Sequence, residues 1–373
     1  MKIDDKTGHN SPSIRFPEFT GEWKYFSIND VCSEFKSGKN IKADLISSNG
    51  NFPVYGGNGL RGYTSSYNHD GLYVLIGRQG ALCGNVRSVF GKIYITEHAI
   101  AVAGNEKSDT NFLHYLFLKM NLGQYSDQSA QPGLAVNKLL KLKVLLPSIS
   151  EQIKIAKLLS LLDERIAVQN RLIEDLKKFK CAIVEKLYSE IQGKEYSYRQ
   201  LFEIINERNS RLEYSNVLSA SQEKGMVNRE DLNLDIKFEL SNINTYKIVR
   251  EGDYVIHLRS FQGGFAFSNM VGVCSPAYTI MRPKKLLEYG YLSYYFTSRK
   301  FIKSLIIVTY GIRDGRSINV DEWLDMKNII PSKEQQQHIL RTIKGFENKI
   351  EVEEMYASCL SKQKQYLLRQ MFI

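Results

Sequence analysis

Two glycine-rich stretches have residue types that could cradle phosphates, and both lack the context that this chemistry needs. Gly57-Asn58-Gly59-Leu60-Arg61-Gly62 matches the G-x-G-x-x-G pattern of dinucleotide sites, which requires a strand before it, a helix after it and an acidic residue about 20 positions on. A polar, turn-rich stretch follows instead, and position 82 is Leu. From Gly84 to Gly91-Lys92 the spacing is too long for a phosphate loop, and Ile93 replaces its Ser or Thr. Both patterns therefore favour loops that reverse the chain.

Candidate catalytic groups are equally isolated. Glu97-His98 could act as an acid–base pair, but nothing near it in the sequence suggests a nucleophile or a metal site, which favours a structural role. Adenine-methylating and nuclease-like motifs are absent from the sequence. The five cysteines are far apart and form no C-x-x-C pair, which fits a reducing cytoplasm and predicts no metal site. We expect no catalysis by this chain alone.

The overall composition predicts a soluble, multidomain protein. At 373 residues and 43% hydrophobic content, two or three domains with proper cores are expected. The first residues have no apolar stretch behind them, and no run is long enough to span a membrane, so we expect no signal peptide and no membrane partner. The net charge of +10 suggests an anionic partner. This excess is spread along the chain, without a basic tail that would grip nucleic acid indiscriminately.

An internal repeat organises the chain. An offset of 184 residues aligns Leu145-Leu146-Pro147-Ser148 with Ile329-Ile330-Pro331-Ser332, and Gln152 with Gln336, without a gap from about residue 134 to 189. Upstream the offsets drift, and Trp23 to Val31 resembles Tyr196 to Ile204 only weakly. The chain is therefore interpreted as two units of about 180 residues, each a mixed segment followed by a helix.

A narrow apolar stripe marks each long helix. It steps by four and three residues, has polar breaks at equivalent places in both repeats, and is expected to be the seam of a coiled coil. The first seam comprises residues 155, 159, 162, 166, 169, 173, 176, 180, 183 and 187, and adding 184 gives the second. With one helix midway and one at the end, an antiparallel pair is expected. One register would place Lys180 near Glu353. Short apolar helices are expected around 110–122 and 287–303.

Several motifs resemble type I restriction–modification specificity subunits. The opening from Ile14 to Trp23 resembles theirs, as do Pro147 to Gln152 and Pro331 to Gln336 at the starts of the long helices. Val54 to Ala81 is similar to one class of their target-recognition domains. Ser275 to Tyr278 and Gly311 to Arg316 resemble the same region of others. In the second helix Glu334-Gln335 comes one residue earlier after the proline, which leaves the start of that helix uncertain.

The resemblance implies an α+β fold of two α/β target-recognition domains joined by two antiparallel helices with a pseudo-twofold repeat. The implied segments are 1–17 (N-terminal polar segment), 18–147 (target-recognition domain 1), 148–195 (first spacer helix), 196–331 (target-recognition domain 2) and 332–373 (second spacer helix). It also implies a non-catalytic subunit that reads a bipartite double-stranded DNA target with two methyltransferase (modification) subunits and restriction subunits. S-adenosylmethionine, ATP and Mg²⁺ are expected on those partners, and no cofactor is expected in this chain.

Exposed turns that carry Arg, Asn or Gln are the candidates for base reading, because these side chains pair bidentately with guanine or adenine. Helices of 35–40 residues would be about 50–60 Å long and act as a ruler between half-sites. Each candidate also has a plain alternative, as a solvated or phosphate-contacting side chain. A coiled-coil scaffold without DNA affinity and a nucleotide-dependent enzyme remain the alternatives for the whole chain. The candidates are Arg61, Tyr63, Arg78, Gln79, Gln128, Arg259, Ser260, Gln262, Arg313 and Arg316.

Overall fold

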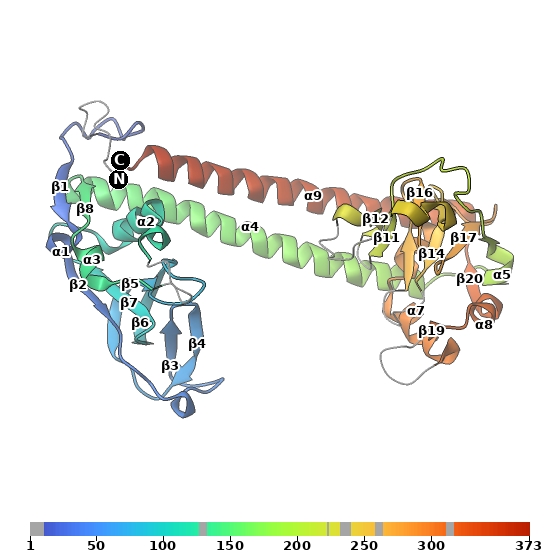
Figure 1. Ribbon diagram of the computed structural model, residues 1–373, viewed down its shortest axis with the longest axis horizontal. Helices are drawn as coiled ribbons and strands as arrows, with labels where there is room; N and C mark the ends of the chain where they lie inside the picture. The colour runs from blue at the N-terminus through green and yellow to red at the C-terminus, as the bar shows by residue number, and fades with distance from the viewer. Residues whose placement is uncertain (1–10, 127–132, 222–223, 232–239, 258–263, 311–316) are drawn as a thin grey trace. The chain divides into compact units, whose positions relative to one another are not determined.

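The computed structural model divides the chain into two compact units (Figure 1). Unit 1 comprises residues 1–170 and 355–373, and unit 2 comprises residues 171–354. The structure describes residues 11–126, 133–221, 224–231, 240–257, 264–310 and 317–373. Within these ranges, none of the helices combines the length and the apolar character that crossing a bilayer requires.

Unit 1 is built on a six-stranded sheet with the order β2-β7-β5-β6-β3-β4. All neighbours pair antiparallel except β3 and β6, which are parallel. A separate pair, β1 with β8, leads into the first long helix. The strands are β1 (Lys24–Ser27), β2 (Cys32–Ser37), β3 (Phe52–Gly56), β4 (Gly59–Thr64), β5 (His69–Gly77), β6 (Val86–Ile95), β7 (Ala99–Gly104) and β8 (Lys143–Leu146); the short helices are α1 (Ile28–Val31), α2 (Thr110–Met120) and α3 (Val136–Leu140).

Helix α2 packs its apolar face onto this sheet, and an N-cap fixes where the helix begins. Asp109 is the N-cap, and its carboxylate accepts a hydrogen bond from the backbone N–H of Phe112 at 2.8 Å. Phe112 is fully buried in the main core of unit 1, where Trp23 and the C-terminal Phe372 are also buried. The expected helix around 110–122 is therefore confirmed, with its end at Met120.

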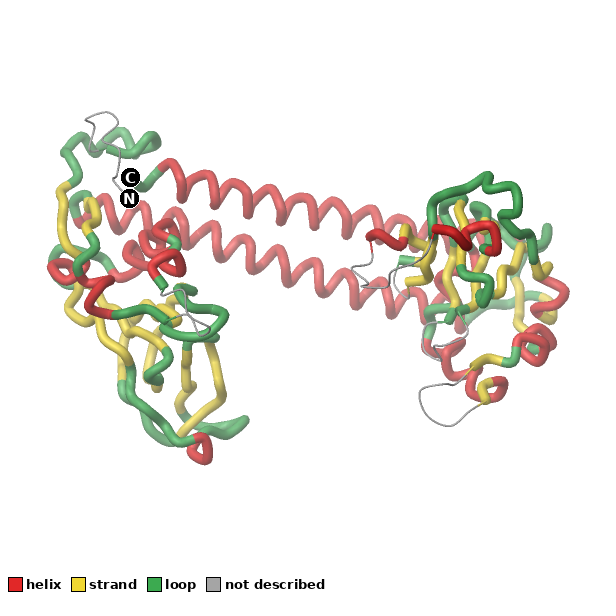
Figure 2. Tube along the Cα trace, viewed as in Figure 1, coloured by secondary structure: helices red, strands yellow, loops and turns green. Residues whose placement is uncertain are grey.

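Among the described residues, unit 2 has a smaller sheet, with the order β10-β17-β14-β15, and four two-stranded ladders. Figure 2 shows the strands in yellow. The strands are β9 (Lys194–Ser197), β10 (Phe202–Ile205), β11 (Leu218–Ser221), β12 (Gly225–Asn228), β13 (Lys247–Val249), β14 (Tyr254–Ile256), β15 (Phe265–Phe267), β16 (Gly272–Cys274), β17 (Thr279–Pro283), β18 (Thr309–Tyr310), β19 (Ser317–Ile318) and β20 (Lys327–Ile330); the short helices are α5 (Tyr198–Leu201), α6 (Tyr291–Tyr295), α7 (Arg299–Ser304) and α8 (Val320–Asp325).

Aromatic rings dominate the core of unit 2. Tyr198 stacks on Trp323 at a centroid distance of 4.3 Å, and Phe296 contacts both rings. The helix expected over 287–303 is divided here into α6 and α7. The break follows from Ser298, whose hydroxyl accepts a hydrogen bond from the backbone N–H of Phe301 and so begins a new helix.

The strand-rich part of each unit begins with the same local structure. Ser27 caps α1 in a reciprocal capping box with Asp30, and Ser197 caps α5 in the same way with Gln200. The two serines also lie opposite repeat-equivalent lysines in the β1–β8 and β9–β20 ladders. The sequence alignment of Trp23 with Tyr196 is therefore displaced by three residues. Ser27 and Ser197 are the equivalent positions, and variable loop lengths concealed them.

The long helices are α4 (Ile149–Ser189) and α9 (Lys333–Gln370). Pro147 and Pro331 lie just before them, as expected, and none of the twenty seam positions is exposed. In unit 1 the start of α4 packs with the end of α9, and in unit 2 the end of α4 packs with the start of α9. The pairing is therefore antiparallel.

The register of the pair differs from the one suggested by the sequence. In unit 2, Lys180 forms an ion pair with Glu347 at 3.1 Å, while Glu353 pairs with Lys349 on its own helix. Glu347 and Glu353 are separated by about 9 Å along the helix axis. Lys180, a polar residue in the seam, therefore pairs with Glu347, which lies outside the seam. The heptad pattern alone does not identify this partner.

Candidate nucleic-acid interface

The first candidate site surrounds the turn between β3 and β4. Gly59 has φ +104°, a left-handed conformation that favours glycine. A side chain at Gly57 would place its Cβ 2.8 Å from the carbonyl oxygen of His98 and 3.6 Å from the Cα of Gly77. The turn therefore packs closely against the backbone at the end of β5 and against the backbone that follows β6. This confirms that the G-x-G-x-x-G stretch reverses the chain, since it forms a hairpin and no helix follows it.

Arg61 is presented to the surface by an irregularity in the hairpin. Val54 lies opposite Gly62 and Tyr55 lies opposite Leu60, so Arg61 is the extra residue of a β-bulge. Its side chain is exposed and crosses Gly56, where a Cβ would lie 2.9 Å from its Cδ. A bulge commonly redirects a side chain in this way next to a binding site.

Arg78 and Gln79 follow β5 and reach the same place. The backbone N–H of Arg78 donates to the carbonyl of His98 at 2.9 Å, and its carbonyl accepts from Leu134. The Oε1 of Gln79 lies 3.0 Å from the Nδ1 of His98. The structure therefore brings Arg61, Arg78 and Gln79 together around the glycine turn, although they are up to 18 positions apart in the sequence.

Tyr63 is different from the other described candidates. Its backbone N–H and carbonyl both pair with Ser47 at 2.9 Å, and its side chain is partly buried. It lies further along β4, where the Cβ of a side chain at Gly50 would approach the Tyr63 Cβ to 2.8 Å. Tyr63 thus holds the loop before β3 in place. The remaining candidates lie outside the described residues: Gln128, Arg259, Ser260, Gln262, Arg313 and Arg316.

Sequence reasoning missed Arg87, at the start of β6. Its guanidinium lies across Gly59, where a Cβ would be 2.9–3.0 Å from Cζ and both terminal nitrogens. The side chain is exposed and lines a small hollow of about 10 Å³ together with the glycine turn. The Leu75–Arg87 pairing between β5 and β6 fixes the register. Sequence spacing carries no signal for this placement, because it depends on the pairing of three strands.

The arginines at this turn are free of carboxylates. Among the described residues, no Asp or Glu oxygen lies within ion-pair distance of Arg61, Arg78 or Arg87, and the buried Nε of Arg78 has no hydrogen-bond partner there. In unit 2, by contrast, Arg282 forms a bidentate pair with Asp253 at 2.9 Å. Arginine without a carboxylate partner is available for an anionic or hydrogen-bond-accepting ligand.

Glu97 and His98 do not form a catalytic pair. The Nε2 of His98 lies 3.2 Å from the Glu97 carboxylate, and its Nδ1 is bonded to Gln79. Both ring nitrogens have partners, and the backbone carbonyl of His98 accepts the bond from Arg78. Across the described ranges, His, Cys, Asp and Glu side chains form no group of three or more suited to hold a metal ion.

A buried glutamine attaches each long helix to its unit. Gln152 is fully buried; its Oε1 accepts from the backbone N–H of Asp109 at 2.9 Å, and its Nε2 donates to the carbonyls of Lys107 and Pro147. Gln336 makes the equivalent bonds to Glu288, Leu286 and Pro331 at 2.8–3.0 Å. The repeat aligns Gln152 with Gln336, and this identity is the sequence feature that could have predicted the shared attachment role. In the second repeat Glu334-Gln335 comes one residue earlier after the proline, but the glutamine that makes these bonds, Gln336, keeps the position equivalent to Gln152.

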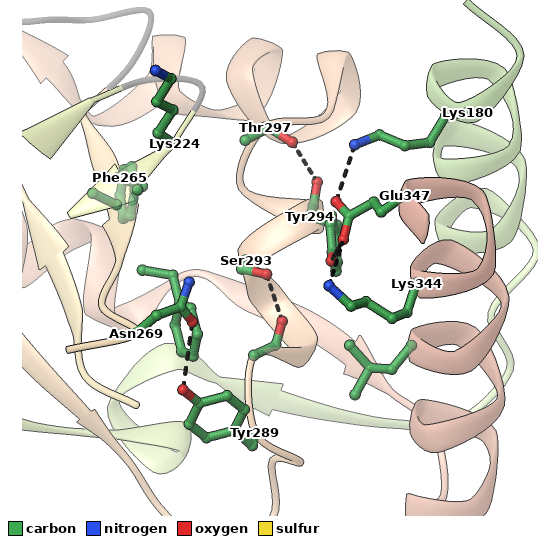
Figure 3. A pocket seen from close by; sticks show the side chains of 15 residues that line it. Lys180, Lys224, Phe265, Asn269, Tyr289, Ser293, Tyr294, Thr297, Lys344 and Glu347 are labelled. Carbon is green, nitrogen blue, oxygen red and sulfur yellow. Dashed lines mark hydrogen bonds and ion pairs between the residues drawn. The ribbon is translucent and has the colours of Figure 1, made fainter. Parts of the chain in front are cut away.

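Each unit also contains a lysine–carboxylate–tyrosine cluster at the paired helices. In unit 2, Glu347 accepts a hydrogen bond from Tyr294 at 2.8 Å and pairs with Lys180, beside a cavity of about 490 Å³ (Figure 3). In unit 1, Asp163 accepts from Tyr115 at 2.9 Å and pairs with Lys364 at 2.5 Å. All six partners are repeat equivalents.

The two tyrosines remain hydrogen-bond donors. Burial and the bond to Glu347 raise the pKa of Tyr294, and burial and the bond to Asp163 raise the pKa of Tyr115. Their hydroxyls therefore stay protonated at physiological pH. Because Tyr115 lies on α2 and Tyr294 on α6, each cluster joins a domain helix to α4 and α9.

The comparisons with known proteins concern the part of the chain that carries this turn. Residues 20–178 match the family model described as "Type I restriction modification DNA specificity domain". The chain is 42% identical over 154 residues to the type I restriction enzyme EcoprrI specificity subunit of Escherichia coli, which covers 40% of this chain and 38% of that protein. It is 23% identical over 286 residues to the putative type I restriction enzyme MjaX specificity subunit of Methanocaldococcus jannaschii, covering 70% and 67%. The match spans about two fifths of the length of the E. coli relative.

Solved structures extend the likeness to the whole fold. The S subunit of a type I restriction-modification system from M. genitalium has a TM-score of 0.60 at 15% identity, over 97% of this chain and 99% of that one. A chain from a study of complex assembly and conformational transition of the type I system gives 0.60 at 13% identity, over 95% and 98%. The α+β fold with two long helices and the resemblance stated from the sequence are both confirmed.

Proposed function

We propose that this chain is the DNA specificity subunit of a type I restriction–modification complex, in which each unit reads one half of a bipartite double-stranded target. The observation that carries this proposal is the glycine turn with Arg61, Arg78 and Arg87, which lies inside residues 20–178. Unpaired arginines supply the donors that read guanine edges and hold phosphates. A turn without side chains lets the backbone approach a nucleic acid closely.

The chemistry of the complex is assigned to other subunits. S-adenosylmethionine, ATP and Mg²⁺ bind the modification and restriction subunits, and this chain contributes recognition and positioning.

The paired helices are proposed to bind two modification subunits. The restriction subunits would then join this assembly. The support is an outer stripe on α4 whose apolar side chains remain exposed although they recur at helical spacing. A helical partner recognises such a stripe by the same seven-residue period that pairs α4 with α9. Its members are Leu161, Val168 and Leu172.

The decisive experiment maps methylated adenines across the genome of a cell that carries the complete system. We expect one split motif with two defined half-sites and a spacer of constant length. Deleting this chain's coding sequence is expected to abolish methylation at that motif, and a catalytically inactive modification subunit should give the same loss, which identifies the motif as a product of this system.

The competing scaffold function makes a different prediction. A scaffold without base recognition would leave methylation independent of sequence, and a footprint of the assembled complex on DNA would show no preferred site. Either result would reject the specificity function and leave the fold assignment intact.

A further inference from the structure

The arrangement of Arg87 goes beyond general DNA binding. Its guanidinium lies flat over the backbone of Gly59, with three of its atoms within 2.9–3.0 Å of the point where a Cβ would stand. The left-handed φ of +104° favours glycine at this position, and a Cβ there would push the guanidinium away from the turn. The arginine head group thus lies against the glycine backbone, although its side chain is exposed.

A planar guanidinium can pair bidentately with a base edge or with a phosphate, and only the base edge makes the contact sequence-specific. Phosphate contacts carry no sequence information and tolerate mobile lysines, whereas a guanine presents O6 and N7 in a geometry that the arginine fork matches bidentately. Preorganisation also lowers the entropy lost when both hydrogen bonds form. Since no described carboxylate lies within ion-pair distance, Arg87 has its donors available.

Arg61 approaches the same turn from the other strand. The bulge directs its side chain across Gly56, so that two arginines flank the four-residue segment Gly56–Gly59. The flanking arrangement lets one arginine read a base while the other contacts the adjacent base pair or phosphate. Of the two, Arg87 is the more constrained, because its head group, and not only its aliphatic stem, contacts the glycine backbone.

We propose that Arg87, held across Gly59, is a specificity-determining residue that reads a guanine in the half-site recognised by unit 1. This inference rests on the proposed function and names the residue and the base class on which part of the specificity depends. A good bidentate contact discriminates against the wrong base pair by about 1–3 kcal/mol, or about 5- to 150-fold.

The test compares methylation profiles in cells that carry the complete system with wild-type chain, Arg87→Ala, Arg61→Ala or the control Lys92→Ala. Lys92 is an exposed cation on the same strand, outside the arginine cluster, and its ammonium lies over the ring of Tyr67. For Arg87→Ala we expect one guanine position to relax by about 5- to 150-fold relative to the other positions. The second half-site should stay unchanged, which also shows that the variant folds and assembles.

The outcomes separate the two proposals. A wild-type profile without a split motif rejects the proposed function and with it this inference. A split motif that Arg87→Ala leaves unchanged, or weakens uniformly at all sequences as Lys92→Ala would, rejects the base-reading role alone. Relaxation that falls in a different half-site from the one altered by Arg61→Ala also overturns it, because both side chains flank one turn.

Gly59→Ala provides an independent check that leaves Arg87 in the chain. The added methyl group displaces the guanidinium and strains the turn, so the same guanine position should relax, although the arginine is present. A Gly59→Ala complex with wild-type discrimination would mean that the geometry over the glycine is irrelevant to recognition.

Discussion

Replacing Gln152 should detach the first long helix from unit 1 and leave unit 2 intact. The side chain is 0% exposed and satisfies three backbone groups from two separate segments of the unit. In Gln152→Ala, the N–H of Asp109 loses an acceptor, and the carbonyls of Lys107 and Pro147 each lose a donor. Asp109 is also the N-cap of α2, so the perturbation reaches the helix that covers the sheet.

The magnitude follows from the burial of these groups. A buried donor left without a partner costs about 1–3 kcal/mol, and each carbonyl, which has a second lone pair, adds about 1 kcal/mol. With a small contribution from the cavity, we expect Gln152→Ala to lower the free energy of unfolding of unit 1 by about 3–5 kcal/mol. That is a large part of the 5–15 kcal/mol that typically stabilises a domain.

Hydrogen exchange read by mass spectrometry is the appropriate assay, because a chain of two units need not unfold in one step. Protection in residues 105–112 and 147–156 should fall by more than about 100-fold, while unit 2 keeps its protection. Gln336→Ala should produce the mirror result in unit 2. Gln363→Ala, at an exposed position of α9, is the matched control and should change neither unit.

A glutamate at the same position separates the donor role from the acceptor role. Gln152→Glu can still accept from Asp109, but it cannot donate to the two carbonyls once it is ionised. Burial raises the pKa of such a carboxyl in the folded state, so stability should be highest at low pH and fall as pH rises through that value. Loss of protection below about fivefold in Gln152→Ala, or loss shared equally by both units, would refute the attachment role.

Three further measurements follow from the structure. Burial lowers the pKa of His114 to about 4, with nearby Lys364 acting in the same direction and Asp163 opposing it, so unit 1 should lose up to about 3 kcal/mol as pH falls from about 6.5 to about 4. Thermal unfolding should show His114→Gln without this loss, and an unchanged pH profile would contradict the assignment. Phe372→Ala should cost about 3 kcal/mol in urea titrations, because its buried ring stacks on Phe112 at 5.1 Å; a change below about 1 kcal/mol would count against that packing. A double-mutant cycle at the Lys180–Glu347 pair should give a coupling of about 1 kcal/mol, and zero coupling would remove the pair as a source of register.

The long helices could be predicted from the sequence because their signal is local and periodic. Pro147 and Pro331 mark their starts, and the seven-residue stripe marks their contact face, so both the elements and the buried positions are correct. The register was missed because Lys180 reaches an acidic residue outside the stripe. The seam pattern predicts which apolar residues face the other helix, but it does not predict which residue a long polar side chain such as Lys180 will contact.

The candidate site was only partly accessible to sequence reasoning, for a different reason. Arg61, Arg78 and Gln79 became candidates because their side chains suit base reading and they lie in or beside glycine-rich stretches of the sequence. Arg87 was missed because it lies inside a strand and meets Gly59 only after β5 and β6 pair and the β3–β4 hairpin folds back onto them. Tyr63 stays a candidate by its side chain, while its backbone pairs with Ser47 and supports the loop before β3. Residue type therefore identified candidates, and only tertiary pairing ranks them.

The repeated clusters explain why the helices pair antiparallel. Asp163 precedes Lys180 by 17 residues, and the repeat places Glu347 and Lys364 at the same spacing. A parallel, in-register pair would set Lys180 beside Lys364 and Asp163 beside Glu347, so that like charges oppose each other at partly buried positions. The antiparallel pair instead joins each lysine to the acid of the other repeat. The acid-to-lysine spacing of 17 residues occurs once in each repeat. It therefore disfavours the parallel orientation at two places and stabilises the antiparallel orientation in both units.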